Sequence, residues 1–304
     1  MHMADALVSP AVGGAMWVAS AGLIAGCAGQ VKRSARENVV PLMGVLGAFV
    51  FTAQMINFSI PGTGSSGHLG GGLILAVLLG PPAAFLVIAS VLTVQALFFA
   101  DGGLLALGCN IFNLGVYPAF IAYPFLYRPL AGDRRHSARV WAAAVMAAVA
   151  GLQLGAFSVV LETRASGISD LPFGTFVWLM QPIHLAIGLV EGLATAAVVT
   201  FVARARPESL YQSPAGSAVP GGGKPVLAGL LVAAALMGGI LSWFASTHPD
   251  GLEWSIARTS GRAPVAEAKP WPAVSAETSG TGLKGGVLTL LLAGAIGLVL
   301  RWRR

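Results

Sequence analysis

Apolar residues fill long windows of this 304-residue chain, and no charged side chain interrupts these windows. They are Ala6–Val31, Asn38–Gly67, Leu69–Ala100, Leu104–Tyr127, Val140–Leu161 and Pro225–Thr247. A helix of roughly 20 apolar residues crosses a bilayer, so each window is long enough for at least one span. The pattern therefore predicts an all-α, polytopic transmembrane helical bundle.

Glycine, proline and charge clusters divide the apolar sequence into about nine segments. These segments cover about 10–31, 38–60, 69–80, 83–100, 104–127, 140–161, 172–203, 225–246 and 286–300. The third is short because Gly80-Pro81-Pro82 interrupts the window Leu69–Ala100. We therefore expect that window to form two arms.

The composition of the chain changes between residues 207 and 224, which are rich in serine, glycine and proline. Such a stretch is typical of a flexible linker. It separates a body at 1–206, with about seven spans, from a companion domain at 225–304. The companion is predicted to be a two-span hairpin whose external loop covers about 247–285.

Hydrophobic residues make up 56% of the chain and charged residues only 10%, which excludes an ordinary soluble protein. The formal charge of +6 does not indicate nucleic acid, because the basic residues cluster at the ends of apolar windows, as topology signals do. Alternating spans place four clusters on the cytoplasmic side of a cell membrane, with the amino terminus outside and the carboxyl terminus inside. The clusters are Lys32, Arg33 and Arg36; Arg128, Arg134, Arg135 and Arg139; Arg204, Arg206 and Lys224; and Arg301, Arg303 and Arg304.

The sequence Met1-His2 at the start of the chain is a ready-made metal chelator. The amine of Met1, the backbone nitrogen of His2 and its ring nitrogen close two fused chelate rings in one plane. His68, in the glycine-rich run 62–72, is predicted to supply the fourth in-plane nitrogen. Four planar nitrogens suit Ni(II) or Cu(II), and Co(II) less well, whereas zinc prefers a tetrahedron. The predicted ligands are thus Met1, His2 and His68, which requires that the amino end is retained and not cleaved as a signal.

Several polar residues are expected to lie around these ligands. Ser65 and Ser66 shortly precede His68 in the sequence and are expected to hold its imidazole. The other candidates are uncharged or acidic residues in or beside the spans, namely Gln54, Asn57, Asp101 and Asn110.

No phosphate-binding loop, GxSxG, HExxH or intramembrane carboxylate pair is found in the sequence, so no catalytic residue is assigned. ATP hydrolysis, if it drives this protein, must reside in another chain. His184 and Glu191 are seven residues apart and share a helix face, so an intramembrane enzyme that uses them stays as an alternative. A scaffold that binds no metal is a further alternative.

Separate motifs occur in an order that resembles the nickel/cobalt substrate-binding components of energy-coupling-factor transporters, the NikM/CbiM family. They are the opening 1–10, the glycine-rich run 62–72, and the stretches 94–104 and 107–113. The segment 248–255 resembles the signature of the small NikN/CbiN-type companion subunit, here fused after the linker.

The resemblance implies a metal site on Met1, His2 and His68, a transmembrane coupling subunit, and cytoplasmic ABC-type ATPases as partners. It further implies transport by tilting of the binding component in the membrane. Cobalt members usually carry His-Pro-Thr-Gly where this chain has His68-Leu69-Gly70-Gly71, which favours Ni²⁺. Co²⁺ uptake for cobalamin synthesis remains the alternative.

Overall fold

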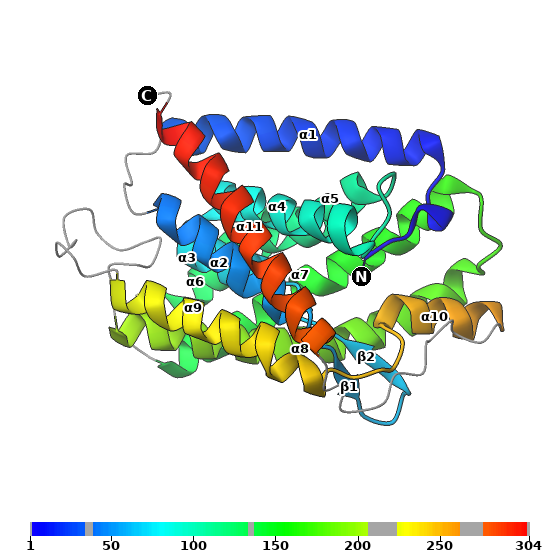
Figure 1. Cartoon of the computed structure of the whole chain (residues 1–304). Helices are drawn as coiled ribbons and strands as arrows, with labels where there is room; N and C mark the ends of the chain where they lie inside the picture. Colours follow the sequence, from blue (N-terminus) through cyan, green and yellow to red (C-terminus); the bar gives the residue numbers. More distant parts are fainter. Residues whose placement is uncertain (1, 34–38, 133–136, 206–223, 262–275, 303–304) are drawn as a thin grey trace.

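Helix accounts for most of the described chain, as the apolar windows predict (Figure 1). The computed structural model describes residues 2–33, 39–132, 137–205, 224–261 and 276–302. The α-helices are α1 (Pro10–Arg33), α2 (Val39–Gln54), α3 (Gly72–Leu79), α4 (Pro81–Phe99), α5 (Leu107–Val116), α6 (Arg128–Ala131), α7 (Ser137–Ser166), α8 (Phe173–Ala205), α9 (Lys224–Gly239), α10 (Gly251–Ser260) and α11 (Ala276–Trp302). The two strands are β1 (Phe58–Ile60) and β2 (Ser65–Gly67).

Among the described residues, six helices are long and apolar enough to cross a membrane. They are α1, α4, the continuous helix 107–131, α7, α8 and the greater part of α11. A π-helical segment, Tyr117–Tyr127, joins α5 to α6 within the third of them. Two shorter apolar helices, α2 and α9, accompany the six. The expected all-α, multi-pass bundle is confirmed.

The predicted break in the window Leu69–Ala100 occurs at Gly80. Gly80 has φ +89°, a backbone conformation that favours glycine, and Pro81 and Pro82 then begin α4. The arm before the break, α3, has only eight residues, all of them buried. Its length of about 12 Å is less than half of a bilayer core, so α3 lies inside the protein and does not cross the membrane by itself.

The segment expected to be helical to residue 60 leaves the helix earlier, at Gln54. The chain then forms the antiparallel hairpin β1–β2, in which Ser59 pairs with Ser66. Its turn contains Gly62 and Gly64 at φ +76° and +74°, which other residues rarely adopt. A pattern of apolar residues alone did not reveal the hairpin, because its strands have three residues each.

The fused companion differs from expectation in length. Its first helix, α9, ends at Gly239 and not near 246, whereas its last helix, α11, begins ten residues earlier than predicted. The external segment contains a helix, α10, that the sequence did not indicate. Of the linker predicted at 207–224, residues 207–223 lie outside the described residues, and Lys224 already begins α9.

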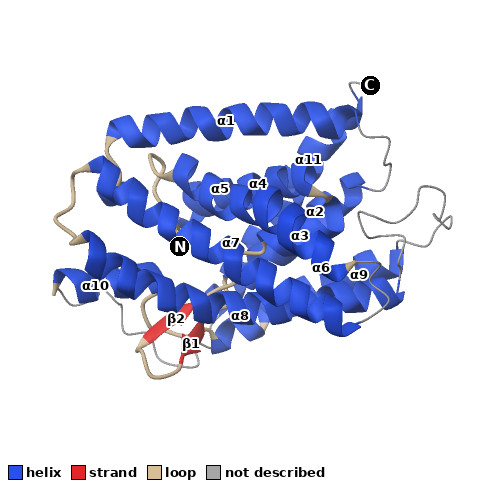
Figure 2. Cartoon of the chain, turned by 180° about the vertical axis from the view of Figure 1, so that it is seen from behind, coloured by secondary structure: helices blue, strands red, loops and turns tan. Residues whose placement is uncertain are grey.

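Helices of the companion pack directly against the body of the protein. α9 and α11 lie along α2, and α10 lies against β2 and α8 (Figure 1). The contact with α2 is close, since a Cβ added at Gly44 would be 2.9 Å from the carbonyl oxygen of Leu290. Seen from behind, α7 and α8 run side by side (Figure 2). Gly188 permits that packing, because an added Cβ there would lie 2.8 Å from Cα of Val149.

Candidate metal-binding site

The start of the chain is held between the α4–α5 loop and α5. The amide of Met3 donates to Oδ1 of Asn110 (2.8 Å), and Nδ2 of Asn110 donates to the Met3 carbonyl oxygen (3.1 Å). The amide of Gly103 donates to the same carbonyl oxygen (2.9 Å). Two residues further on, Oδ1 of Asp5 accepts from the amide of Ala106 (3.0 Å). These bonds fix the backbone on the carboxyl side of His2, a role that the sequence did not assign to Asn110.

The His2 side chain is buried, with 5% of its surface exposed. Its Nδ1 lies 3.0 Å from Oδ1 of Asp101, whose side chain is 44% exposed. Burial raises the pKa of Asp101, but the electrostatic interaction and the hydrogen bond with His2 outweigh burial, so the pKa of Asp101 is lowered overall. The other ring nitrogen of His2, Nε2, is buried and has no hydrogen-bond partner among the described residues.

His68 follows β2 directly, and its ring stacks on that of His2. The two ring centroids are 4.9 Å apart and the ring planes differ by 12°. Nδ1 of His68 donates to the carbonyl oxygen of Leu69 (3.0 Å), which leaves the lone pair on Nε2. Burial lowers the pKa of His68 to about 4, so this imidazole is neutral near pH 7 and able to bind a metal. The fold thus brings together two imidazoles that lie far apart in sequence.

The backbone after His68 is fixed by a carboxylate from α8. Oε2 of Glu191 accepts from the amide of Gly70 (2.7 Å), and Oε1 accepts from the amide of Gly71 (3.1 Å). Nε2 of Gln54 donates to the Gly70 carbonyl oxygen (2.8 Å), and Nε2 of Gln95 donates to Oε1 of Gln54 (2.8 Å). The sequence drew attention to Glu191 only together with His184, seven residues away on the same predicted helix face. The sequence did not predict that Glu191 would bind the backbone of the distant loop after His68.

The companion contacts the hairpin immediately before His68. The amide of Ser66 donates to the carbonyl oxygen of Pro249 (2.8 Å), and its hydroxyl donates to the carbonyl oxygen of His248 (2.8 Å). Nε1 of Trp254 donates to the carbonyl oxygen of Thr63 (2.9 Å). The loop that precedes α10 therefore lies beside the histidine pair.

The remaining candidates have other partners. The hydroxyl of Ser65 donates to the backbone carbonyl of Ser66 (3.2 Å), so the bonds of both serine hydroxyls run to backbone carbonyls and not to the imidazole of His68. Asn57 accepts at its backbone carbonyl from the amide of Ser246 (2.6 Å), which ties the hairpin to the companion. Met1 lies outside the described residues.

Within the described ranges, no group of three or more His, Cys, Asp or Glu side chains is arranged to hold a metal ion. His184 and Glu191, two turns apart on α8, have different partners. Nδ1 of His184 donates to the carbonyl oxygen of Met180 (2.8 Å), whereas Glu191 binds the loop after His68.

Comparisons with known proteins agree on one family. Residues 2–209 match the family CbiM, described as cobalt uptake substrate-specific transmembrane region, and residues 224–274 match the PDGLE domain. A putative fused nickel transport protein NikMN of Archaeoglobus fulgidus is 37% identical over 217 residues, 71% of this chain and 70% of that protein. A putative metal transport protein of Haloquadratum walsbyi is 36% identical over 69% of this chain and 94% of its own length. The crystal structure of a transition metal transporter is similar with a TM-score of 0.60 and 28% identity, over 68% of this chain and 95% of that chain.

Proposed function

Because the chain belongs to the CbiM family of transition-metal transport proteins and carries a fused PDGLE companion, we propose that it captures Ni²⁺ for an ATP-driven uptake transporter of the energy-coupling-factor type. Membership in the family makes it a multi-pass membrane component of nickel or cobalt transport. The choice of ion and the coupling to ATP go beyond that membership.

The observation that carries the proposal is the stacked pair of His2 and His68 at the buried start of the chain. In the proposed site, the Met1 amine, the His2 backbone nitrogen and Nδ1 of His2 occupy three corners of a square, and Nε2 of His68 occupies the fourth. Nδ1 of His2 then leaves Asp101 when the ion binds. A planar field of four nitrogens favours Ni²⁺ over Co²⁺.

Cobalt is the second candidate ion, and a specific observation favours it. The family that matches residues 2–209 is described by cobalt uptake, whereas the fused relative in Archaeoglobus fulgidus is named for nickel. Competition between Ni²⁺ and Co²⁺ for the purified chain, followed by isothermal titration calorimetry, distinguishes the two. Tighter binding of Co²⁺ would contradict the nickel assignment.

The division of labour within the chain is part of the proposal. Residues 1–206 bind the metal, and 207–224 connect this body to the companion at 225–304. The external loop of the companion helps to load the ion. Its contacts with Ser66, next to His68, support a loading role. The amino terminus lies outside and the carboxyl terminus in the cytoplasm. ATP hydrolysis belongs to separate ATPase subunits, which act through a transmembrane coupling subunit.

The test is to block the amine. A permanent, histidine-free extension at the amino terminus and, separately, His68→Gln should each lower Ni²⁺ affinity by about a hundredfold or more, because each removes one nitrogen from a chelate. His248→Gln serves as the matched control, since that histidine is exposed and belongs to the companion loop. Unchanged Ni²⁺ binding by the extended protein would overturn the proposed site.

A further inference from the structure

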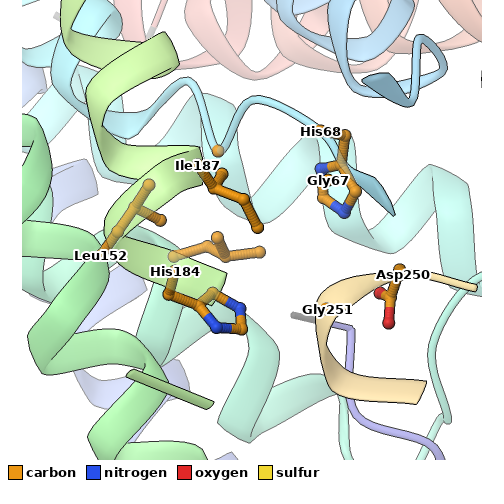
Figure 3. A pocket seen from close by; sticks show the side chains of 9 residues that line it. Gly67, His68, Leu152, His184, Ile187, Asp250 and Gly251 are labelled. Atoms are coloured by element: carbon orange, nitrogen blue, oxygen red, sulfur yellow. The ribbon is translucent and has the colours of Figure 1, made fainter. Parts of the chain in front are cut away.

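A small cavity of about 10 Å³ lies beside His68, which is roughly the space that one water molecule requires. Its polar side chains are those of His68, His184 and Asp250, and the rest of its wall consists of glycine and aliphatic residues (Figure 3). The three polar residues come from the β2–α3 loop, from α8 and from the residue that precedes α10. The cavity thus lies where the companion meets the histidine loop.

His184 lines this cavity, and one of its two ring nitrogens has an unused lone pair. The side chain is 1% exposed, and its Nδ1 donates to the carbonyl oxygen of Met180 (2.8 Å), so Nε2 is the acceptor nitrogen. Nε2 is buried and has no hydrogen-bond partner among the described residues. A buried acceptor without a partner is destabilising, so its presence here calls for a functional reason. Ionisable residues inside membrane spans are rare and usually functional.

The first residue of α10, in the companion, lies close to the imidazole of His184. A Cβ added at Gly251 would lie 2.6 Å from Cγ2 of Ile183 and 3.3 Å from Cε1 of His184, so a side chain there would force these atoms or α10 to move. Asp250 is held at the cavity wall by a capping box, in which its Oδ1 accepts from the amide of Glu253 (2.8 Å). The carboxylate and the imidazole are therefore positioned by different parts of the chain around one small space.

We propose that Nε2 of His184 and the Asp250 carboxylate form a second, weaker position for a divalent transition-metal ion, through which the ion passes between the companion loop and the His2–His68 pair. This inference rests on the proposed function. Imidazole nitrogen and carboxylate oxygen are both ligands that Ni²⁺ and Co²⁺ accept. A position with so few protein ligands releases its ion readily, which a transit position requires. His68 borders both positions and connects them.

Binding of Co²⁺ to the purified full chain tests the second position, with visible absorption as the measurement. In a His2→Ala background, which removes the proposed tight site, weak Co²⁺ binding should remain. Adding His184→Gln or Asp250→Asn should weaken that residual binding about tenfold or more. Asp250→Asn keeps a side-chain oxygen that can accept from the amide of Glu253, so the cap of α10 is preserved. This variant therefore tests the second position even if His184→Gln fails to fold.

His248→Gln in the same background is the matched control and should leave the residual binding unchanged. In the otherwise native chain, His184→Gln should keep tight Ni²⁺ binding within about twofold but slow Ni²⁺ uptake by cells.

Two results would mean that the cavity holds only water and would overturn the second position. One is that residual Co²⁺ binding is equal with and without His184, and the other is that His2→Ala shows no residual Co²⁺ binding. Loss of tight binding in His184→Gln would also overturn it, because His184 would then support the first site. Absence of tight Ni²⁺ binding in the unaltered chain would instead overturn the proposed function.

Discussion

His68 is positioned by a carboxylate that lies far along the chain. Glu191 accepts two backbone amides of the loop that follows the histidine, one on each carboxylate oxygen. Hydrogen bonds are stronger in a water-poor interior than in water, because no solvent competes for the donors. Glu191 therefore positions the backbone that carries His68 and is not itself one of the proposed metal ligands.

Replacing Glu191 by glutamine should lower Ni²⁺ affinity about tenfold, because the amide group keeps only one acceptor oxygen for two backbone donors. Calorimetric titration of the purified protein measures the change. Glu162→Gln is the matched control, since Glu162 is also a buried carboxylate of a span, but it binds the side chain of Asn113 (2.8 Å) and not this loop. Equal losses in both variants would argue against a positioning role.

His68 also predicts how the metal-free protein responds to acid. Its pKa is about 4 in the folded state, below the ordinary value of 6.5. From about pH 6.5 down to about pH 4, the unfolded state takes up a proton that the folded state does not, so stability falls as the pH falls through this window. At about pH 5 the loss relative to neutral pH is about 2 kcal/mol. Between neutral pH and about pH 5, the melting temperature of the His68→Gln variant should therefore fall less than that of the unaltered chain. An identical decrease in both proteins would contradict the prediction.

At the scale of elements, the close contact between α10 and α8 depends on one glycine. Gly251 leaves no space for a methyl group beside Ile183 and His184. The same contact places Pro249 where its carbonyl accepts from the amide of Ser66. Docking of the companion and protection of the Ser66 amide are therefore coupled.

Gly251→Ala should displace the companion loop, because overpacking of this kind costs about 1–3 kcal/mol. Hydrogen exchange of peptides that contain Ser66 should then quicken by about tenfold or more. Gly229→Ala is the control within the same domain, since nothing lies within 4 Å of a Cβ added there. If both variants exchange at the rate of the unaltered protein, the close contact does not hold the loop.

For the whole molecule, the basic clusters give an orientation that can be measured. They put the β1–β2 turn outside and the start of α7 in the cytoplasm. Pro61 and Ser137 are exposed at these two places, and the two native cysteines, Cys27 and Cys109, are buried.

A membrane-impermeant maleimide applied to intact cells should therefore label Pro61→Cys and not Ser137→Cys. Opening the cells should make both accessible. The unaltered chain, with its buried cysteines, is the control for background labelling. The reverse pattern would place the amino terminus in the cytoplasm and contradict uptake from outside.

The sequence predicted that His68 would lie near His2, but it did not predict the long-range hydrogen bonds around this pair. Apolar runs show which segments avoid water, but not which loops contact one another. The sequence therefore did not predict the hairpin β1–β2, and it named Asp101 as a nearby candidate without predicting its contact with Nδ1 of His2. Ser65 and Ser66 were expected to orient the imidazole by proximity in sequence. The tertiary structure instead gives that place to Leu69, Glu191 and Gln54 through hydrogen bonds of the loop backbone.

The sequence by itself determined the membrane-embedded all-α class and the break at Gly80, and it singled out His2 and His68 as proposed metal ligands. Each of these follows from local physics, such as transfer of apolar side chains into lipid, the backbone freedom of glycine, and the chemistry of imidazole. The tertiary structure decided that the two rings stack and that a buried carboxylate fixes the loop of one of them. It also decided that the companion closes over a cavity with His184. These features depend on helix packing between distant segments, because a buried polar group is satisfied by whichever partner the fold brings within reach.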